Sequence, residues 1–187
     1  MSDLTKCVID CETTGLDRYQ HDLIQLAIVP INDRLEPIKE VLNIRVKALT
    51  PETACQFALQ INGLDPLNGL NLEESKSTFY SWLTVNAIER IVPIAFNYAF
   101  DFLFIEKWLV TCGLQYKDYF HYAQRDVFVL ANCANDARRF KGMKPLFTST
   151  SLGSICNTFG IEHSAAHDAL SDCYLTLEVY KKLLMIA

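Results

Sequence analysis

Short apolar runs of strand length dominate the first half of this chain, at first one after another and later between helix-like segments. They predict strands over Leu4 to Asp10, Leu23 to Ile31 and Ile38 to Val46, followed by a buried strand over Arg90 to Ala95. Consecutive strands can pair as antiparallel hairpins, whereas strands separated by helices can run parallel. The order therefore predicts an α/β fold in which helices cover a mixed sheet.

Helix signals fill much of the remaining sequence. We expect helices from Thr50-Pro51 to just before Asn62, from Asn71 to about Val85, after Ala95, from Ser151 to Phe159 and from Ala165 to Leu184. In the helix after Ala95, Phe100, Phe104 and Trp108 recur every four residues and mark one face. A stripe of this kind is more often part of a core than a platform for stacking bases, so we assign it to the core.

The length of 187 residues predicts a single domain over residues 1–187. Hydrophobic residues make up 50% and charged residues 21% of the chain, as in a well-packed globular protein. No apolar run approaches the ~20 residues that cross a bilayer. Asp10 and Glu12 stand where the apolar part of a signal peptide would lie. We therefore expect a cytoplasmic protein that has no membrane partner.

Charge and cysteine content narrow the class of function. The 17 basic and 22 acidic residues give a net charge of -5, which argues against a protein that coats duplex DNA. An enzyme that holds a few nucleotides through metal ions remains compatible with this charge. The seven cysteines are scattered and contain no CxxC pair, which favours buried reduced thiols over a disulfide framework or a zinc site.

The first chemical signal is the pair Asp10 and Glu12 at the end of the first predicted strand. Alternate residues of a strand share a face, so both carboxylates point the same way while Cys11 points into the opposite layer. Adjacent acids repel each other unless a cation lies between them, and oxygen ligands favour hard divalent ions such as Mg²⁺ or Mn²⁺. Alone, the pair is a weak signal, because a solvated turn accounts for it as well.

Two further acidic positions follow the later elements. Asp101 comes just after the buried strand, at the sheet edge where ligands collect in α/β proteins, although a helix-capping aspartate would look the same. His167 and Asp172 are five residues apart and can border one cleft if His167 lies in the first turn of the last helix. Asp168 and Asp172 share a helix face, which also suits a polar, acid-rich helix start.

Taken together, these segments resemble the three motifs of the DEDDh, or DnaQ-like, 3′-to-5′ exonucleases. The matching segments are Ile9-Asp10-Cys11-Glu12-Thr13-Thr14-Gly15-Leu16, Phe96 to Asp101, and His167-Asp168-Ala169-Leu170-Ser171-Asp172. The similarity runs from Cys7 to Leu184. It implies a ribonuclease-H-like three-layer fold with a mixed five-stranded sheet. The first three strands would be antiparallel, and the strands near Arg90 and Asp126 would run parallel to the first.

The resemblance also implies a chemistry. Asp10, Glu12, Asp101 and Asp172 would hold two divalent cations, Mg²⁺ or Mn²⁺, with Asp10 bridging both. Glu12 and Asp172 would complete one ion, and Asp101 would contribute to the other. His167 would act as general base, since an ordinary histidine pKa near 6.5 suits proton removal from a metal-bound water. The reaction would release nucleoside 5′-monophosphates from the 3′ end of DNA or RNA, with a preference for single strands.

Substrate contacts carry over from the same resemblance to four residues. Thr13 and Leu16 would contact the 3′ hydroxyl and wedge against the terminal base, and Asn62 and Asn97 would be weaker contributors. Three positions depart from the family pattern: Tyr98 stands where the second motif usually has alanine, Asn62 where many relatives have histidine, and Phe96 where the family usually has a histidine on the substrate side. The replacement of this histidine by Phe96 would affect the way substrate is positioned more than it would affect catalysis.

Several alternatives stay open at this point. The chain could be a catalytically silent nucleic-acid-binding or interaction module on the same fold, although none of the four acids is lost. It could also be a nuclease for very short RNA, or work beside a polymerase or another replication or repair protein. The basic residues Arg125, Arg138, Arg139, Lys141 and Lys144, with the aromatics Tyr116, Tyr119, Phe120 and Tyr122, could form a strand-guiding patch. A solvated helix face explains these basic residues equally well.

Overall fold

The computed structural model describes residues 4–163 and 168–186. Its centre is a five-stranded sheet in the order β3-β2-β1-β4-β5. The strands are β1 (Leu4–Thr13), β2 (Leu23–Ile31), β3 (Leu42–Arg45), β4 (Arg90–Ala95) and β5 (Arg125–Asp126). β1, β2 and β3 pair antiparallel, whereas β4 runs parallel to β1 and β5 runs parallel to β4. The predicted mixed sheet is confirmed, including the direction of each strand.

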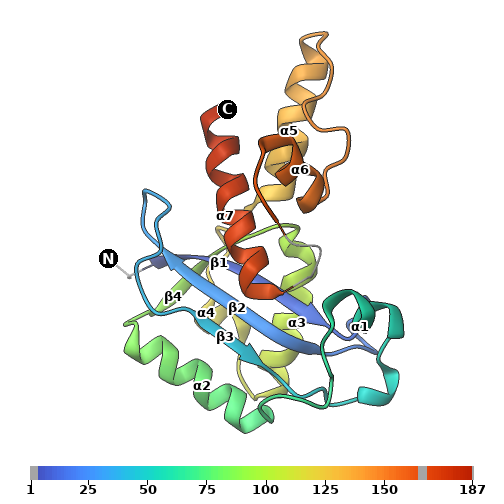
Figure 1. Cartoon of the computed structure of the whole chain (residues 1–187). Coiled ribbons are helices and arrows are strands. Elements are labelled where there is room, and N and C mark those ends of the chain that lie inside the picture. Colours follow the sequence, from blue (N-terminus) through green and yellow to red (C-terminus); the bar gives the residue numbers. More distant parts are fainter. Residues whose placement is uncertain (1–3, 164–167, 187) are drawn as a thin grey trace.

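Helices cover both faces of this sheet (Figure 1). They are the short 3₁₀ turn η1 (Pro51–Thr53), α1 (Gln56–Asn62), α2 (Leu72–Val85), α3 (Tyr98–Thr111), α4 (Tyr116–Tyr119), α5 (Val127–Phe140), α6 (Leu152–Phe159) and α7 (Ala169–Ile186). α2, α3 and α4 lie on one face, and α5, α6 and α7 lie on the other. The three-layer arrangement that the resemblance implied is therefore present.

Each face of the sheet has its own apolar core, because β1 sends alternate side chains to opposite sides. Cys7, Ile9 and Cys11 pack toward α2 and α3, together with Phe104 and Trp108. Phe104 and Trp108 are the helical stripe that the sequence assigned to the core, and both are buried. The same alternation leaves Asp10 and Glu12 on the face covered by α7, at the carboxyl end of the strand.

Local signals define several helix ends as predicted. Asn71 closes a capping box, in which its side chain accepts the N–H of Glu74 at 3.0 Å and its own N–H reaches Glu74 Oε2 at 2.9 Å. Ser151 caps α6, and Gly160 ends that helix with a left-handed φ of 67°. Side-chain capping and a glycine therefore account for these boundaries without reference to tertiary contacts.

Tertiary contacts moved other boundaries. The helix expected from Thr50-Pro51 is only the 3₁₀ turn η1, and α1 begins later, at Gln56. The reason is that Cys55 donates its N–H to Thr14 O at 2.8 Å, which takes this group out of helical pairing. α1 also includes Asn62, so the predicted end was one residue early.

Three other segments differ from the expectation. The third strand is shorter than predicted and covers 42–45; ahead of it, Glu40 O accepts the indole N–H of Trp82 at 2.7 Å rather than an N–H of β2. The final helix begins at Ala169; the predicted start at Ala165 lies outside the described residues. α5 had no sequence-based prediction. No helix of the described residues is long and apolar enough to cross a membrane.

Candidate active site

The carboxyl end of β1 and the first turn of α7 bring three acids together. Asp10 and Glu12 come from β1, and Asp172 comes from the helix that crosses β1 and β2. Each of the three side chains offers one carboxylate oxygen, and these three oxygens all lie within 4.8 Å of one another. Residues from the two ends of the sequence therefore form one partly buried cluster.

Asp101 approaches the same cluster from the other side of β1. It lies in the first turn of α3, is 2% exposed, and accepts the N–H of Cys11 through Oδ1 at 3.0 Å. This N–H belongs to the peptide bond that links Asp10 to Cys11. The fourth predicted acid is thus anchored to the backbone between the two β1 carboxylates.

Asp126 orients the helix that carries Asp101. Its carboxylate accepts the N–H groups of Asn97 and Tyr98 at 3.1 and 3.0 Å, at the start of α3. It also caps α5 through the N–H of Phe128 at 3.0 Å. Asn97 has a left-handed φ of 66°, which turns the chain sharply from β4 into α3.

Burial and neighbouring like charges raise the pKa values of three of these acids. Burial, reinforced by the charges of Asp101 and Asp172, raises the pKa of Asp10 well above its ordinary value. Burial also raises the pKa of Glu12 to about 7, with Asp172 adding to the effect, and burial raises the pKa of Asp101 to about 7. Burial and like charge favour the protonated form of each acid, so all three shifts have the same physical origin.

These acids fit a divalent cation. Within residues 4–163 and 168–186, no basic side chain forms an ion pair with Asp10, Glu12 or Asp101. Buried charge without a counter-charge is costly, and a bound cation would remove that cost. Carboxylate oxygens are the ligands that Mg²⁺ and Mn²⁺ prefer. Asp10, Glu12 and Asp172 would hold such an ion, with Asp101 close by.

The turn after β1 is tightly built. Thr13 is buried and donates its hydroxyl to Gly15 O at 2.7 Å, and Asn62 Nδ2 donates to Thr13 O at 3.1 Å. A Cβ on Gly15 would lie 2.6 Å from the ring of His21, so a larger residue here would displace this imidazole, which accepts the N–H of Asp17 at 3.0 Å. Asn62 also hydrogen-bonds Glu12, which lowers the pKa of that carboxyl against the effect of burial.

The four predicted substrate residues have different environments. Thr13 and Asn62 are buried and hydrogen-bonded within the protein, whereas Leu16 is 83% exposed directly after the turn. Asn97 is exposed at the start of α3. Leu16 and Asn97 therefore offer their side chains to a ligand, while Thr13 and Asn62 chiefly shape the turn. Contact with substrate stays a prediction for all four.

The predicted general base, His167, lies outside the described residues. The other nearby histidine, His163, is exposed, and its Nε2 lies 3.3 Å from Asn157 Oδ1 on α6. His163 is thus tied to α6, the helix that precedes this segment. This placement agrees with a supporting role for His163 and leaves the assignment of His167 as a prediction.

The family's histidine position is apolar in this chain. Phe96 is half-buried and meets Phe128 edge to face, with ring centroids 5.8 Å apart. The neighbouring departure, Tyr98, is fully buried and hydrogen-bonds the hydroxyl of Tyr116. Both side chains therefore pack against neighbouring aromatic residues around the start of α3.

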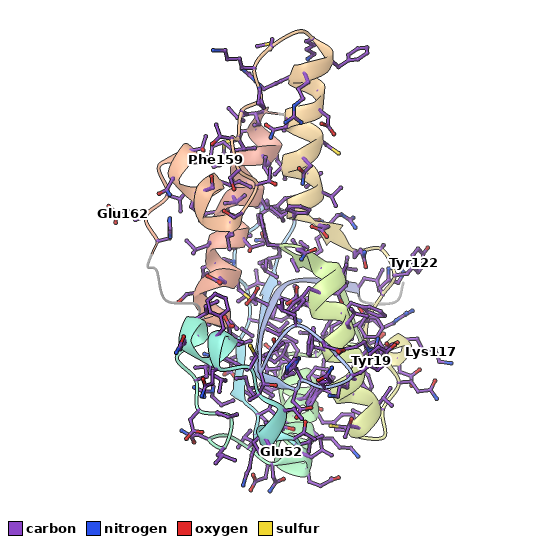
Figure 2. The ribbon with its side chains drawn as sticks, turned by 90° about the vertical axis from the view of Figure 1, so that its right-hand side faces the viewer. Tyr19, Glu52, Lys117, Tyr122, Phe159 and Glu162 are labelled. Atoms are coloured by element: carbon purple, nitrogen blue, oxygen red, sulfur yellow. The ribbon has the colours of Figure 1, made fainter. Side chains whose placement is uncertain are left out.

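A joint patch of basic and aromatic residues is not formed. Tyr116 and Tyr119 pack against the core below α3, and Phe120 is part of that core. Arg138 and Lys141 lie instead toward the end of α5. This helix projects away from Lys117 on α4 and from Tyr122 in the loop that follows α4 (Figure 2). Of the two readings left open, the structure favours a solvated helix face over a patch made from both sets, because Tyr116, Tyr119 and Phe120 pack in or against the core.

One site residue was missed by sequence reasoning. Gln25 on β2 lies opposite Glu12 in the strand register and donates a hydrogen bond to Asp168 Oδ1 at 2.8 Å. Its only sequence signal is an amide within the otherwise apolar run Leu23–Ile31. Asp168 was noted as sharing a helix face with Asp172, but the partner across the sheet could not be inferred from helix spacing.

A mixed α/β sheet with four acids at the carboxyl edge of its central strands defines a ribonuclease-H-like nuclease. The family model for the exonuclease domain of ribonuclease T type matches residues 7–180. This chain belongs to that exonuclease family, so its sequence-based assignment to the DnaQ-like 3′-to-5′ exonucleases is confirmed.

Individual relatives agree with this assignment. The ribonucleases T of Shewanella baltica and Shewanella oneidensis are each 26% identical to this chain over 186 residues, covering 92% of this chain and 78% of theirs. Exonuclease I of E. coli, solved with a dT13 oligonucleotide, superposes with a TM-score of 0.78 at 22% identity. That match covers 97% of this chain but only 41% of exonuclease I, so this chain spans about two fifths of that protein.

Proposed function

We propose that this chain is a divalent-metal-dependent 3′-to-5′ exonuclease that removes nucleoside 5′-monophosphates from single-stranded DNA or RNA. The observation that carries this proposal is the cluster of Asp10, Glu12 and Asp172, whose oxygens lie within 4.8 Å of one another beside the buried Asp101. The relatives support the choice of substrate: one group is named for ribonuclease activity, and the other was solved with a DNA oligonucleotide.

The chain's own residues have separate tasks in this proposal. Asp10, Glu12, Asp101 and Asp172 would hold two cations, Mg²⁺ or Mn²⁺. Bound there, the cations would supply activation of water and stabilisation of charge on the leaving 3′ oxygen. Asp101 keeps its orientation through the N–H of Cys11. His167 takes the proton from the attacking water, and Leu16 lies against the terminal base. Thr13 and Asn62 hold the turn next to the 3′ end, with Asn97 at its rim.

The experiment that tests this function is a substrate panel. Single-stranded DNA and RNA oligonucleotides, labelled at the 5′ end, are incubated with Mg²⁺, Mn²⁺ or a chelator. We expect a ladder that shortens from the 3′ end, mononucleotide products, no reaction in chelator, and protection by a 3′-terminal phosphate. Release first from the 5′ end, or equal loss of blocked and free ends, would contradict the polarity.

Matched variants make this panel decisive. Asp10→Asn should abolish product release, while Asp118→Asn makes the same chemical change at an exposed aspartate on α4 and should leave it unchanged. A wild-type protein that releases no mononucleotide from any substrate would favour the alternative of a silent binding module. Activity confined to RNA of a few nucleotides would select the short-RNA alternative.

The base is tested separately. A positioned general base contributes about 10²–10⁴-fold in rate. His167→Ala should lower kcat within that range and leave metal-induced stabilisation intact, because His167 is not proposed as a ligand. His163→Ala should cost much less, since His163 contacts Asn157 on α6. A larger loss from His163→Ala would overturn the assignment.

We also propose a cytoplasmic location and the company of a polymerase or another replication or repair protein. All seven cysteines are free, as expected in a reducing compartment. Co-purification of the tagged protein from its host, with and without nuclease treatment, would show whether such a partner binds directly.

A further inference from the structure

Gln25 is a buried amide in an apolar strand. Every other residue of β2 (Leu23–Ile31) is apolar, and Gln25 is only 3% exposed. Its backbone lies directly opposite Glu12 in the β1–β2 register. A buried amide is tolerated only when its hydrogen bonds are made, so the partners of Gln25 indicate what the residue does.

Both polar atoms of this side chain have partners, on β3 and at the start of α7. Nε2 donates to Asn43 Oδ1 at 3.0 Å and to Asp168 Oδ1 at 2.8 Å. Oε1 accepts the N–H of Ala169 at 3.4 Å. Asn43 belongs to the neighbouring strand β3, whereas Asp168 and Ala169 form the start of α7. The amide therefore connects the sheet at Glu12 to the first turn of the helix that carries Asp172.

Asp168 completes this connection on the helix side. Its Oδ2 accepts both the N–H and the hydroxyl of Ser171 at 3.0 Å, which caps α7. Its own carbonyl accepts the N–H of Asp172 at 2.9 Å. One oxygen of Asp168 thus faces Gln25 and the other faces the helix, so the position of Asp172 depends on both bonds.

We propose that Gln25 is a positioning residue for the exonuclease reaction. Its amide holds Asp168 and the first turn of α7 against β2. Asp172 is thereby kept beside Asp10 and Glu12, and Asp168, which directly follows the proposed base, is kept in place. This role rests on the proposed function. Partners in the outer shell of a metal site typically contribute 10–100-fold to metal affinity or activity.

The direction of the hydrogen bond allows a reciprocal exchange. Gln25→Glu keeps the shape and the acceptor for Ala169 but places a second carboxylate against Asp168. Asp168→Asn replaces that carboxylate by an amide, whose single oxygen cannot accept from both Ser171 and Gln25. The double variant Gln25→Glu, Asp168→Asn restores one N–H···O bond in the opposite direction with the same total charge. Asn43→Ala, which removes the partner on β3, is the matched control.

We expect each single exchange to lower kcat about 10–100-fold with KM within about threefold, because buried Gln25 does not face the substrate. The same variants should weaken Mn²⁺ binding by about 10-fold or more in calorimetry. The double variant should recover most of both losses, and Asn43→Ala should change neither by more than about threefold. Circular dichroism and urea unfolding verify that each variant is folded.

The Mn²⁺ titration separates this role from the proposed function. A wild-type protein without turnover would refute the proposed function, and the Mn²⁺ affinities of the four variants would still decide the role of Gln25. Wild-type Mn²⁺ affinity in folded Gln25→Glu would overturn the role. So would a double variant that binds Mn²⁺ no better than the weaker single variant, because a packing residue gains nothing from a reversed hydrogen bond.

Discussion

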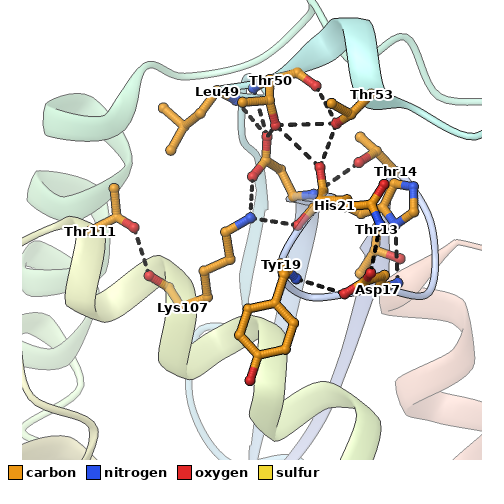
Figure 3. Close-up of polar contacts among 12 residues, drawn as sticks. Thr13, Thr14, Asp17, Tyr19, His21, Leu49, Thr50, Thr53, Lys107 and Thr111 are labelled. Carbon is orange, nitrogen blue, oxygen red and sulfur yellow. Dashed lines mark hydrogen bonds and ion pairs between the residues drawn. The ribbon is translucent and has the colours of Figure 1, made fainter.

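Two almost fully buried aspartates, Asp22 and Asp101, lie near the turn after β1, and their surroundings shift their pKa values in opposite directions. Asp22, 5% exposed, accepts the N–H groups of Leu49 and Thr50 at 2.9 and 2.8 Å and the ammonium of Lys107 at 2.8 Å. Figure 3 shows this network around Lys107, which also donates to His21 O. Burial alone would raise the pKa of Asp22, but these hydrogen bonds hold that pKa below its ordinary value.

Asp101, 2% exposed, has its pKa shifted in the opposite direction. It accepts the N–H of Cys11 and lies among Asp10, Glu12 and Asp172, and burial raises its pKa to about 7. Both aspartates are buried, so burial alone does not distinguish a structural acid from a functional one. The presence or absence of a balancing positive charge does, because an unbalanced buried charge is retained only where something else, here a cation, compensates for it.

The largest expected effect of this contrast is on catalysis. Asp101→Asn should lower kcat by more than the ~10–100-fold that outer-shell partners of metal sites contribute. Asp22→Asn should keep activity within about 10-fold per folded molecule, because Asp22 acts on the turn rather than on the cations. Steady-state kinetics on a single-stranded oligonucleotide measure both. Equal losses would mean that the two acids do not have separate roles.

The next largest effect is on stability, where the Asp22 variant should lose more than the Asp101 variant. Removing one partner of a buried ion pair typically costs about 3–5 kcal/mol, so Asp22→Ala should lower the free energy of unfolding by about that amount. Asp101→Asn should raise it in metal-free protein, because a repelled carboxylate is replaced by a neutral amide. Urea unfolding in chelator measures both, with Lys107→Met as the reciprocal break of the Asp22 pair. Destabilisation by Asp101→Asn would show that its charge is balanced after all.

The smallest effect is a pH dependence of opposite sign for the two regions. Glu12 and Asp101 have pKa values of about 7 in the folded protein, above those of ordinary carboxyls, so the native state binds more protons than the unfolded state. Stability of the metal-free protein should therefore fall as pH rises from about 4 to about 7. Asp22, whose pKa is lowered, adds stability that is lost only as pH falls below about 4.

Melting temperatures across this range provide the measurement. We expect the metal-free protein to melt at lower temperature at about pH 7.5 than at about pH 5, and Asp101→Asn to flatten this slope. Mn²⁺ should cancel the fall at neutral pH, because bound cations favour the ionised carboxylates. A melting temperature that rises with pH in chelator would contradict the pKa shifts.

The sequence predicted the parts of the structure that depend on local pattern. Strand alternation placed Asp10 and Glu12 on one face, and the order of strands predicted the mixed sheet, because both follow from period and connectivity. The resemblance assigned Asp101 and Asp172 to the same site. The structure places Asp172 beside Asp10 and Glu12 and hydrogen-bonds Asp101 to the N–H of Cys11, and their roles as ligands stay a prediction.

What the sequence could not predict depends on contacts between distant segments. The bond from Cys55 to Thr14 shifted the start of α1, and Gln25 reaches Asp168 across 143 residues. The bond from the Asn62 amide to Thr13 O was not anticipated either, and contact between Asn62 and substrate stays a prediction. These partners are set by tertiary packing, for which neither hydrophobic period nor capping signals provide a cue.

We expect the unbalanced carboxylates at the end of β1 to bind divalent cations. Crystals grown in chelator and soaked in Mn²⁺ test it directly, through anomalous scattering at the manganese edge. We expect an anomalous peak in contact with Asp10, Glu12 and Asp172, a second near Asp101, and no peak beside Asp22. Peaks absent from the cluster at millimolar Mn²⁺, or located only beside acids such as Asp22 that are already paired, would contradict the account.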